Sequence, residues 1–266
     1  MVVAQITDLH LTAEGSLAEG RIDTAAGLSH CIAQINRLDP LPEALMLTGD
    51  LANLGRAEEY QRLRRLLASL AMPTFIIPGN HDDRSALRAA FDNHGYLPRQ
   101  GSFLHYAVND FPLRLIALDT VVPNQGYGAL CAERLDWIDA RLSEAHAKPT
   151  LIFMHHPPFA TGIAHMDALR LIEGADAFGA IVARHAQIKL IACGHVHRTI
   201  VTEFYGKPIV VCPSTAHQIV LNLQPDGPAE FDFEPPGFML HVWDGARVVT
   251  HTIPVGEFDG PYAFED

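Results

Sequence analysis

Short runs of apolar residues alternate with helix-like segments along this sequence. The runs are rich in aliphatic and β-branched residues and have the length of buried strands. Between them, apolar residues recur near every 3.6 positions, which is typical of amphipathic helices. The alternation predicts an α/β fold. The main strands expected from the pattern are Val2–Thr7, Ala44–Thr48, Pro73–Pro78, Thr150–Met154 and Ile188–Cys193.

Helices are expected between these strands. The clearest pattern covers Arg56–Leu70, where tyrosine and leucine side chains share one face. An earlier helix, which begins at Ile22, is expected to end before Asp39-Pro40, because the residue that precedes a proline disfavours helical backbone. Three further helices are predicted near residues 83–91, 132–145 and 176–185.

The chain becomes β-rich after Cys193, and its last strands are expected to form a second sheet. Residues 222–237 are rich in proline and glycine, which predicts a loop or an oligomerisation arm within a single domain, 1–266. Two earlier strands are close enough to form a hairpin: Phe103–Val108 and Leu113–Asp119. The later strands are Thr199–Tyr205, Pro208–Cys212, Phe238–Trp243 and Arg247–Ile253.

Polar clusters follow directly after five of the predicted strands. Because the carboxyl ends of strands in an α/β sheet meet at one crevice, the clusters are expected to form one site. The clusters are Asp8-Leu9-His10, Gly49-Asp50, Gly79-Asn80-His81-Asp82, His155-His156 and Gly194-His195-Val196-His197.

The side chains of these clusters have the composition of a transition-metal site. They offer imidazole nitrogens with carboxylate and amide oxygens, and no sulfur, which suits Fe, Mn, Co or Zn better than Ca or an iron–sulfur cluster. Seven donors exceed what one tetrahedral ion can use, so two ions that share one carboxylate are expected. The seven candidate ligands are Asp8, His10, Asp50, Asn80, His155, His195 and His197.

The spacing within two clusters is also informative. An extended backbone would place Asp8 and His10 on the same side, because side chains two residues apart share a face. The same reasoning applies to His195 and His197, and the preceding Gly194 would permit a sharp turn. Each pair is therefore expected to converge on one centre.

Two further segments are expected to reach the crevice. His217 follows the strand Pro208–Cys212, so its ring is a candidate for the site. The segment Phe159–Leu169, which follows the His155-His156 cluster, is expected to line the substrate pocket, with Phe159 and Met166 as apolar walls.

Composition narrows the classes of partner. A net charge of −12 argues against a basic surface for a nucleic-acid polymer, and no apolar run is long enough for a membrane span. The four cysteines are far apart, so neither a thiolate metal site nor a disulfide framework is expected. The first strand begins at Val2 and leaves no room for a secretory signal, so a cytoplasmic location is expected.

The ordered series D-x-H, G-D, G-N-H-D, H-H and G-H-V-H, from residue 8 to residue 197, resembles the calcineurin-like metallophosphoesterase superfamily. Within it, Asn53 and the G-N-H-D-D and M-H-H-P-P stretches are similar to bacterial glycerophosphodiesterases and class III cyclic-nucleotide phosphodiesterases. The resemblance implies a four-layer αββα sandwich of two mixed sheets flanked by helices, and a homo-oligomer.

The resemblance also implies a role for each cluster. Asp50 would bridge the two metals, and His81 and His217 would lie near the phosphoryl oxygens or the leaving group. Either of these two histidines could be the general acid. The resemblance places Asp8, His10 and His197 on one metal, and Asn80, His155 and His195 on the other.

The leading hypothesis is hydrolysis of a small phosphodiester by in-line attack of a hydroxide bound to two divalent or mixed-valence metal ions. The substrate could be a glycerophosphodiester or a 3',5'-cyclic nucleotide. One alternative is a phosphomonoesterase, although only Arg84 and Arg198 lie near the motifs to bind a dianion. Another is a non-catalytic, metal-stabilised interaction module that docks through the arm Gln224–Gly237.

Overall fold

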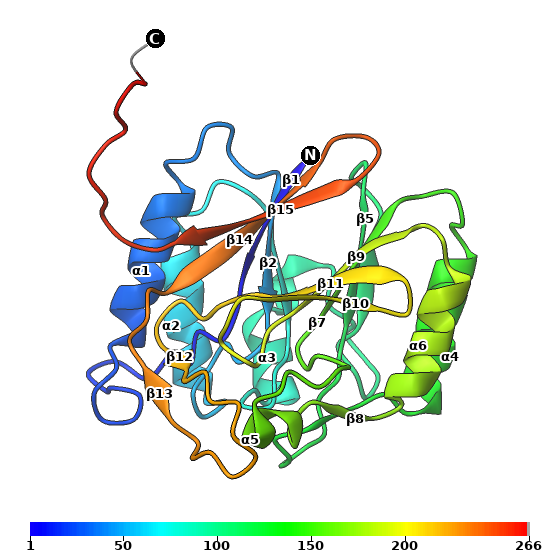
Figure 1. Ribbon diagram of the computed structural model, residues 1–266, viewed down its shortest axis with the longest axis horizontal. Coiled ribbons are helices and arrows are strands. Elements are labelled where there is room, and N and C mark those ends of the chain that lie inside the picture. The colour runs from blue at the N-terminus through cyan, green and yellow to red at the C-terminus, as the bar shows by residue number, and fades with distance from the viewer. Residues whose placement is uncertain (265–266) are drawn as a thin grey trace.

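The computed structural model describes residues 1–264, and two mixed β-sheets lie face to face in it (Figure 1). Sheet 1 has the strand order β15-β14-β1-β2-β3. Strands β1, β2 and β3 are parallel, and β14 runs antiparallel to both of its neighbours. The strands are β1 (Val2–Ile6), β2 (Ala44–Thr48), β3 (Thr74–Ile77), β14 (Gly237–Trp243) and β15 (Val248–Pro254).

Sheet 2 has the strand order β10-β11-β9-β7-β5-β4. Its four central strands are parallel, and an antiparallel strand closes each edge. The strands are β4 (Tyr106–Val108), β5 (Arg114–Leu118), β7 (Thr150–Met154), β9 (Ile188–Cys193), β10 (Ile200–Phe204) and β11 (Lys207–Val211).

Helices cover the outer face of each sheet. Leu28 of α1 (Thr24–Ile35) and Leu63 of α2 (Ala57–Leu67) are buried in one cluster with sheet 1, and Phe178 of α6 (Ala175–Arg184) is buried with the outer face of sheet 2. Figure 1 shows α1 and α2 on one side of the molecule and α4 and α6 on the other. The predicted sandwich of two mixed sheets flanked by helices is therefore confirmed. The helices are α1 (Thr24–Ile35), α2 (Ala57–Leu67), α3 (Arg84–Ala90), α4 (Ala132–Ser143), α5 (Ala164–Asp167) and α6 (Ala175–Arg184), with a 3-10 turn at Asp92–His94.

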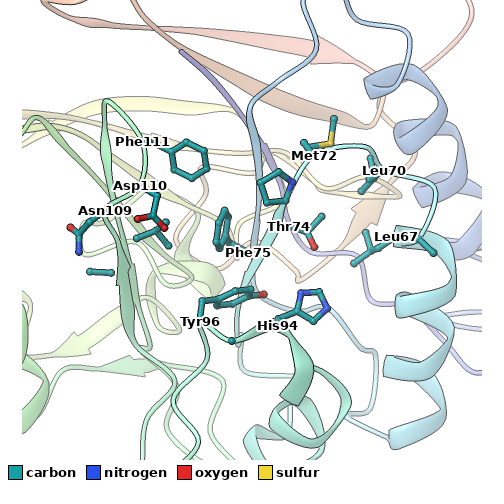
Figure 2. Close-up of a pocket in the computed structure, with 15 residues that line it drawn as sticks. Leu67, Leu70, Met72, Thr74, Phe75, His94, Tyr96, Asn109, Asp110 and Phe111 are labelled. Carbon is teal, nitrogen blue, oxygen red and sulfur yellow. The ribbon is translucent and has the colours of Figure 1, made fainter.

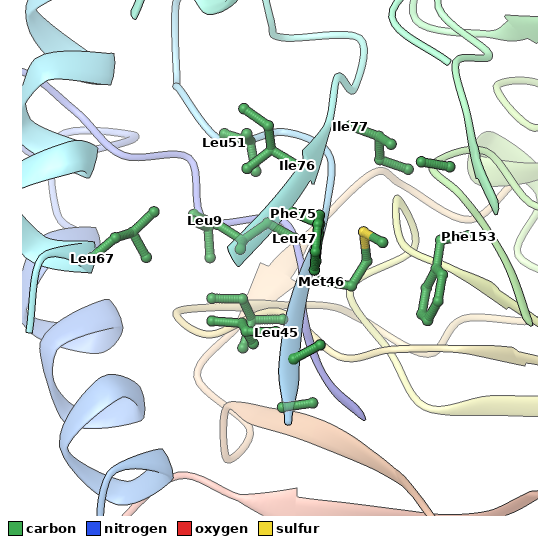
Figure 3. Packing of buried hydrophobic residues seen from close by; sticks show 14 of the residues in the cluster. Leu9, Leu45, Met46, Leu47, Leu51, Leu67, Phe75, Ile76, Ile77 and Phe153 are labelled. Carbon is green, nitrogen blue, oxygen red and sulfur yellow. The ribbon is translucent and has the colours of Figure 1, made fainter. Parts of the chain in front are cut away.

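The central strand β2 packs on both of its faces. Its five residues are all buried, and neighbouring side chains leave opposite faces of the strand. Figure 3 shows Leu45 on the side of Leu67 from α2, and Met46 on the side of Phe153 from β7. A strand buried on both faces reads as a continuous apolar run, which is why Ala44–Thr48 could be recognised from the sequence.

Two helices begin at aspartate caps beside the strand ends. The Asp23 carboxylate accepts from the N–H of Ala26 at 3.0 Å, and the Asp83 carboxylate accepts from the N–H of Ala86 at 2.7 Å. Such caps satisfy backbone donors that have no partner within the helix. The second cap makes the chain enter α3 directly after Asn80 and His81, which keeps those two side chains at the end of β3.

The expectation that the last strands form a second sheet is wrong for two of them. Strand β14 pairs antiparallel with β1, with Val3 opposite His241, and β15 extends the same sheet. The predicted hairpin of β4 and β5 is confirmed, although β4 begins at Tyr106 and not at Phe103. Local apolar periodicity does not show which distant segments pair. The sheet to which a strand belongs could therefore not be predicted from the sequence pattern.

The proline-rich arm, residues 222–237, lies largely outside regular structure. It contains β13 (Phe231–Asp232), which pairs with β12 (Gln218–Ile219). Its role in oligomerisation stays a prediction. A second short pair joins β6 (Gly128–Ala129) to β8 (Leu171–Glu173). Within residues 1–264, no helix is both long and apolar enough to span a bilayer.

Candidate metal centre

The carboxyl ends of five strands from both sheets meet at one edge of the sandwich. Backbone hydrogen bonds join the loops after β1 and β2, from the N–H of Asp8 to the carbonyl of Gly49 (3.0 Å) and from that of His10 to the carbonyl of Asp50 (2.9 Å). The N–H of His195 donates to Asp8 Oδ2 at 2.8 Å and connects the two sheets. The polar clusters predicted from the sequence therefore lie together.

The candidate ligand atoms are within a few ångströms of one another. Nε2 of His10 lies 3.1 Å from Nε2 of His197 and 3.6 Å from Oδ2 of Asp50. Nε2 of His155 lies 3.4 Å from Asp50 Oδ2 and 3.2 Å from the side-chain oxygen of Asn80. Asp50 is thus close to histidines of both predicted metal sites, as a bridging carboxylate would be.

These distances fit a cation. Donor atoms about 2.1 Å from one ion are about 3.0 to 3.4 Å apart in octahedral or tetrahedral geometry. Moreover, Oδ1 of Asp8 and Nε2 of His195 are buried without a hydrogen-bond partner in the described chain, and Nε2 of His197 lies 3.4 Å from that Oδ1. Buried polar atoms without partners are costly, and a bound ion would satisfy them.

Backbone carbonyls orient two of the imidazole rings through hydrogen bonds to Nδ1. Nδ1 of His155 donates to the carbonyl of Thr48 at 2.8 Å, and Nδ1 of His197 donates to the carbonyl of His217 at 3.1 Å. With Nδ1 held by a backbone carbonyl, Nε2 of each ring faces the site, which is the usual orientation of a metal-ligating histidine.

The electrostatics of the site also suit cations. Burial alone would raise the pKa of Asp8, but the His197 and His155 imidazoles outweigh it and lower that pKa to about 2. Burial likewise opposes ionisation of Asp50, yet His155 and His81 hold its pKa well below the usual value. Both carboxylates are therefore anionic at neutral pH.

The histidines divide into two kinds. Burial lowers the pKa of His195 to about 3 and that of His10 well below the usual value, so both rings are neutral at pH 7. For His155, burial lowers the pKa, but Asp50 and Asp8 overcome it and raise the pKa to about 9. Neutral imidazole is the form that binds metals, and a cation would compete with the proton for Nε2 of His155.

The backbone of the clusters is left-handed, and the expectation of an extended D-x-H backbone is wrong. Asp8 and His10 have φ values of 51° and 43°, and His195 and His197 have 75° and 53°. Asp50 has a φ of 48°. The side chains therefore converge through tight turns, at roughly 1–2 kcal/mol of backbone cost for each residue.

A sharp turn does begin at Gly194, whose carbonyl accepts from the N–H of Val196 at 2.9 Å, but the positive φ of this turn lies at His195. The φ of Gly194 is not positive, and a Cβ atom at this position would lie 2.0 Å from Oγ1 of Thr7 and 2.9 Å from Oδ2 of Asp8. Glycine is needed here because the chain after β9 passes against the end of β1.

Asp82 organises the site, a role that was not predicted from the sequence. Its carboxylate accepts from the N–H groups of Gly79 (2.8 Å), Leu51 and Ala52 (both 3.1 Å), and from the hydroxyl of Tyr60 (2.9 Å). Burial and the nearby Asp50 raise its pKa to about 6. This side chain fastens the loop that carries Asn80 to the loop that carries Asp50.

His81 and His217 lie beside the candidate ligands. The His81 ring is 4.6 Å from that of His10, and its Nδ1 donates to the carbonyl of Asn53 at 2.9 Å. Asp50 is the main cause of a raised pKa at His81. The ring of His217 is 4.6 Å from that of His197, and burial lowers its pKa to about 3.

A pocket of about 260 Å³, the central pocket, opens over this cluster. Met166 lines this pocket, as expected. Phe159 does not line it, and its ring packs instead against the apolar cluster on the outer face of sheet 2. The pocket is also lined by three residues that were not predicted from the sequence, Glu19, Glu230 and Phe231. Phe231 comes from the proline-rich arm and lies 5.4 Å, ring to ring, from His217.

A larger cavity of about 770 Å³ lies away from these residues. It opens between β3 and β4, at the sheet edges, and the rings of Phe75, Tyr96 and Phe111 surround it (Figure 2). None of the candidate metal ligands lines it. The central pocket is therefore the site that the polar clusters form.

Known proteins resemble this chain over most of its length. Residues 1–199 match the family model described as calcineurin-like phosphoesterase. A probable glycerophosphodiester phosphodiesterase GpdQ of Arcobacter nitrofigilis is 37% identical over 265 residues, which is 99% of this chain and 97% of that protein. The 3',5'-cyclic adenosine monophosphate phosphodiesterase CpdA of Escherichia coli is 27% identical over 81% of this chain and 76% of its own length.

A solved structure shares the fold. The dimetal phosphatase from Danio rerio superposes with a TM-score of 0.67 at 16% identity, and the match covers 96% of this chain and 99% of that one.

Proposed function

The chain belongs to the calcineurin-like phosphoesterase family, and we therefore propose that it is a metal-dependent phosphodiesterase acting on small phosphodiesters. The observation that carries this proposal is the group of seven neighbouring donors, from Asp8 to His197, five of which line the central pocket. Relatives that cover nearly the whole chain are named glycerophosphodiester or cyclic-nucleotide phosphodiesterases, which supports diester hydrolysis.

The ligand assignment is part of the proposal. Asp8, His10 and His197 would hold one ion, since their donor atoms lie within 4.8 Å of one another. Asn80, His155 and His195 would hold the other, and Asp50 would bridge them. Iron, manganese, zinc and cobalt all suit such donors. When bound, a pair of such ions activates water for attack at phosphorus and neutralises charge on the phosphoryl oxygens.

The residues of the chain would then position the diester and handle the proton. Hydrolysis forms a bond from water oxygen to phosphorus and breaks the bond to one alcohol oxygen, which must gain a proton. With Nδ1 of His81 bound to the carbonyl of Asn53, Nε2 remains for the phosphoryl group or the leaving oxygen. We assign this role to His81, and a supporting one to His217, whose carbonyl orients His197.

A phosphomonoesterase is not favoured, because the central pocket offers no arginine or lysine within the described part of the chain. The two arginines near the motifs have other partners. Arg84 makes a bidentate ion pair with Asp119 (2.7 and 2.8 Å), and Arg198 pairs with Glu234 at 2.8 Å.

The four unpaired cysteines fit a reducing compartment such as the cytoplasm.

The test combines metal analysis with turnover. Elemental analysis of the purified protein should find about two transition-metal ions per chain. Bis(p-nitrophenyl) phosphate should be cleaved at least about tenfold faster than p-nitrophenyl phosphate, and chelation should abolish both activities. Asp50→Asn should lower turnover at least about 100-fold, whereas Asp136→Asn, on the exposed face of α4, should not. Metal-loaded protein that cleaves no ester would overturn the proposal and favour an interaction module.

A further inference from the structure

The loop that follows β5 lies at the same edge of sheet 2 as two candidate ligands, His155 and His195. This is because β5, β7 and β9 are parallel, so that their carboxyl ends meet at one edge. We name residues 119–121 the β5 loop. Its Asp119 and Thr120 side chains are fully buried and are not among the seven candidate ligands. Each of them instead contacts a segment that carries one of those ligands.

The Asp119 carboxylate holds the start of α3. It accepts two hydrogen bonds from Arg84, at 2.7 and 2.8 Å, and it also accepts from the N–H groups of Leu104 (2.8 Å) and Val121 (3.0 Å). A bidentate pair fixes the direction of a guanidinium group as well as its distance. Arg84 is the first residue of α3 and comes four positions after Asn80, so the pair anchors the segment that carries this ligand.

The Thr120 side chain holds the ring of His156, which directly follows the candidate ligand His155. A hydrogen bond of 2.7 Å joins Oγ1 of Thr120 to Nδ1 of His156. The ring is fully buried, and a Cβ atom at Gly128 would lie 2.7 Å from its Nδ1, so the backbone of β6 packs directly against it. The N–H of Ala129 donates to the carbonyl of Thr120 at 2.9 Å and keeps β6 against the β5 loop.

The ring of His156 in turn packs against that of His195. The two ring centroids are 4.6 Å apart, and the ring planes meet at 53°. This contact is important because Nε2 of His195 has no hydrogen-bond partner in the described chain, whereas the carbonyl of Thr48 orients His155. The direction of the His195 ring therefore depends on the side chains packed around it, and Thr120 fixes one of them.

We propose that the β5 loop positions two ligands of the second metal ion, Asn80 through Arg84 and His195 through His156. The proposal rests on the metal assignment in the proposed function, in which Asn80, His155 and His195 hold this ion. Asp119 and Thr120 are then positioning residues, which touch neither the ion nor the substrate. Removal of such supporting groups typically weakens metal binding about 10- to 100-fold.

The ion assigned to Asp8, His10 and His197 should be affected less. The carbonyl of His217 orients His197, and none of the contacts of the β5 loop described above reaches these three ligands. Loss of the contacts of the loop should therefore weaken one metal-binding step and spare the other. A general loss of structure at the site would weaken both steps together, so the two explanations can be separated by measurement.

The test is a titration of the metal-free protein with Co²⁺, followed by calorimetry and by the visible absorption of the bound ion. The step that Asn80→Ala weakens identifies the second ion. Thr120→Val removes only the hydroxyl, and Arg84→Gln removes the ion pair. Both should raise the Kd of that step about tenfold or more and change the other Kd less than about threefold. Thr120→Ser keeps the hydroxyl and should restore the wild-type values.

Two variants away from the site make the same chemical changes and serve as controls. Thr202→Val lies on the exposed part of β10, and Arg184→Gln breaks a surface ion pair with Asp139, whose Oδ2 is 3.0 Å from Nη2. Neither should change either Kd. If Arg84→Gln does not fold, as circular dichroism would show, Arg84→Lys replaces it and should weaken the same step by a smaller factor.

Each remaining outcome counts against a stated idea. An unchanged second step in Thr120→Val, or an equal weakening of both steps, would overturn the inference while the diesterase activity stands. Wild-type protein that binds two ions and cleaves no diester would remove the proposed activity and leave the positioning role intact. Wild-type protein that binds no transition metal would overturn both.

Discussion

The backbone N–H of His195 donates to Oδ2 of Asp8, although the two residues lie 187 positions apart. The same oxygen accepts from the hydroxyl of Thr7 at 2.8 Å, while Oδ1 has no hydrogen-bond partner in the described chain. One oxygen of the carboxylate thus joins β1 to β9, and the other is free for an ion.

The different roles of the two carboxylate oxygens predict the effect of Asp8→Asn. The amide oxygen can replace Oδ2 and keep both hydrogen bonds, but the NH₂ group cannot replace Oδ1 as a ligand. The variant should fold, bind no more than about half of the wild-type metal, and lose at least about 100-fold in turnover. Elemental analysis and circular dichroism check this, and full metal occupancy would contradict it.

Asp82→Asn should affect stability more than Tyr60→Phe. The carboxylate accepts four hydrogen bonds, so an amide there leaves buried donors facing an NH₂ group. We expect a loss of about 2–4 kcal/mol in the free energy of unfolding, against about 1 kcal/mol when only the Tyr60 hydroxyl is removed. Urea unfolding of metal-free protein measures both, and an equal loss would be inconsistent with the role assigned to Asp82.

Gly194→Ala tests the close approach between β1 and β9. The added methyl group would meet Oγ1 of Thr7, so the variant should lose more than about 2 kcal/mol of stability and bind metal less tightly. Gly245→Ala is the control, because that glycine has a φ of 102° and open space around it. It should show only the backbone cost of about 1–2 kcal/mol, and a comparable loss in the two variants would refute the steric explanation.

The pH dependence of stability should report on His241. This ring is fully buried between Thr250 Oγ1 (2.9 Å) and the side-chain oxygen of Gln5 (3.0 Å), and burial lowers its pKa to about 3. The unfolded chain, in which the pKa of a histidine is about 6.5, therefore binds more protons between pH 6.5 and pH 3. The contribution of His241 to the free energy of unfolding is therefore largely present above about pH 6.5. It decreases as the pH falls, and about 2 kcal/mol is lost at pH 5.

His241→Gln should reduce this slope. Unfolding curves at pH 7 and pH 5, compared between wild type and variant, measure the difference. If the variant lost as much stability as the wild type between these two pH values, another group would have to be responsible.

Local patterns in the sequence predicted the elements better than their partners. The run Thr150–Met154 is a strand with the predicted bounds, because burial on both faces leaves an apolar signature. The pairing of Val3 with His241 has no such signature, since it depends on contacts between the two ends of the chain. Sheet membership was therefore wrong for β14 and β15.

The position of the site was readable for a related reason. A polar residue directly after a buried strand, such as Asp50 after Ala44–Thr48, stands out against the apolar run. The geometry was not readable, because side chains at φ values near 50° look the same in a sequence as extended ones. Residues that reach the pocket from outside the two main sheets, such as Glu19 in a turn and Phe231 in the short strand β13, carry no local signal and could be found only in three dimensions.

The five left-handed residues at the strand ends have a consequence for the life of the protein before it is active. Together their backbone cost is on the order of 5 kcal/mol, which is comparable to the net stability of many domains. The folded, metal-free protein pays this backbone cost until ions bind and offset it. Loading should therefore be the step that makes the molecule resistant to proteolysis, and a cell short of metal would hold fewer copies of the protein as well as less active ones.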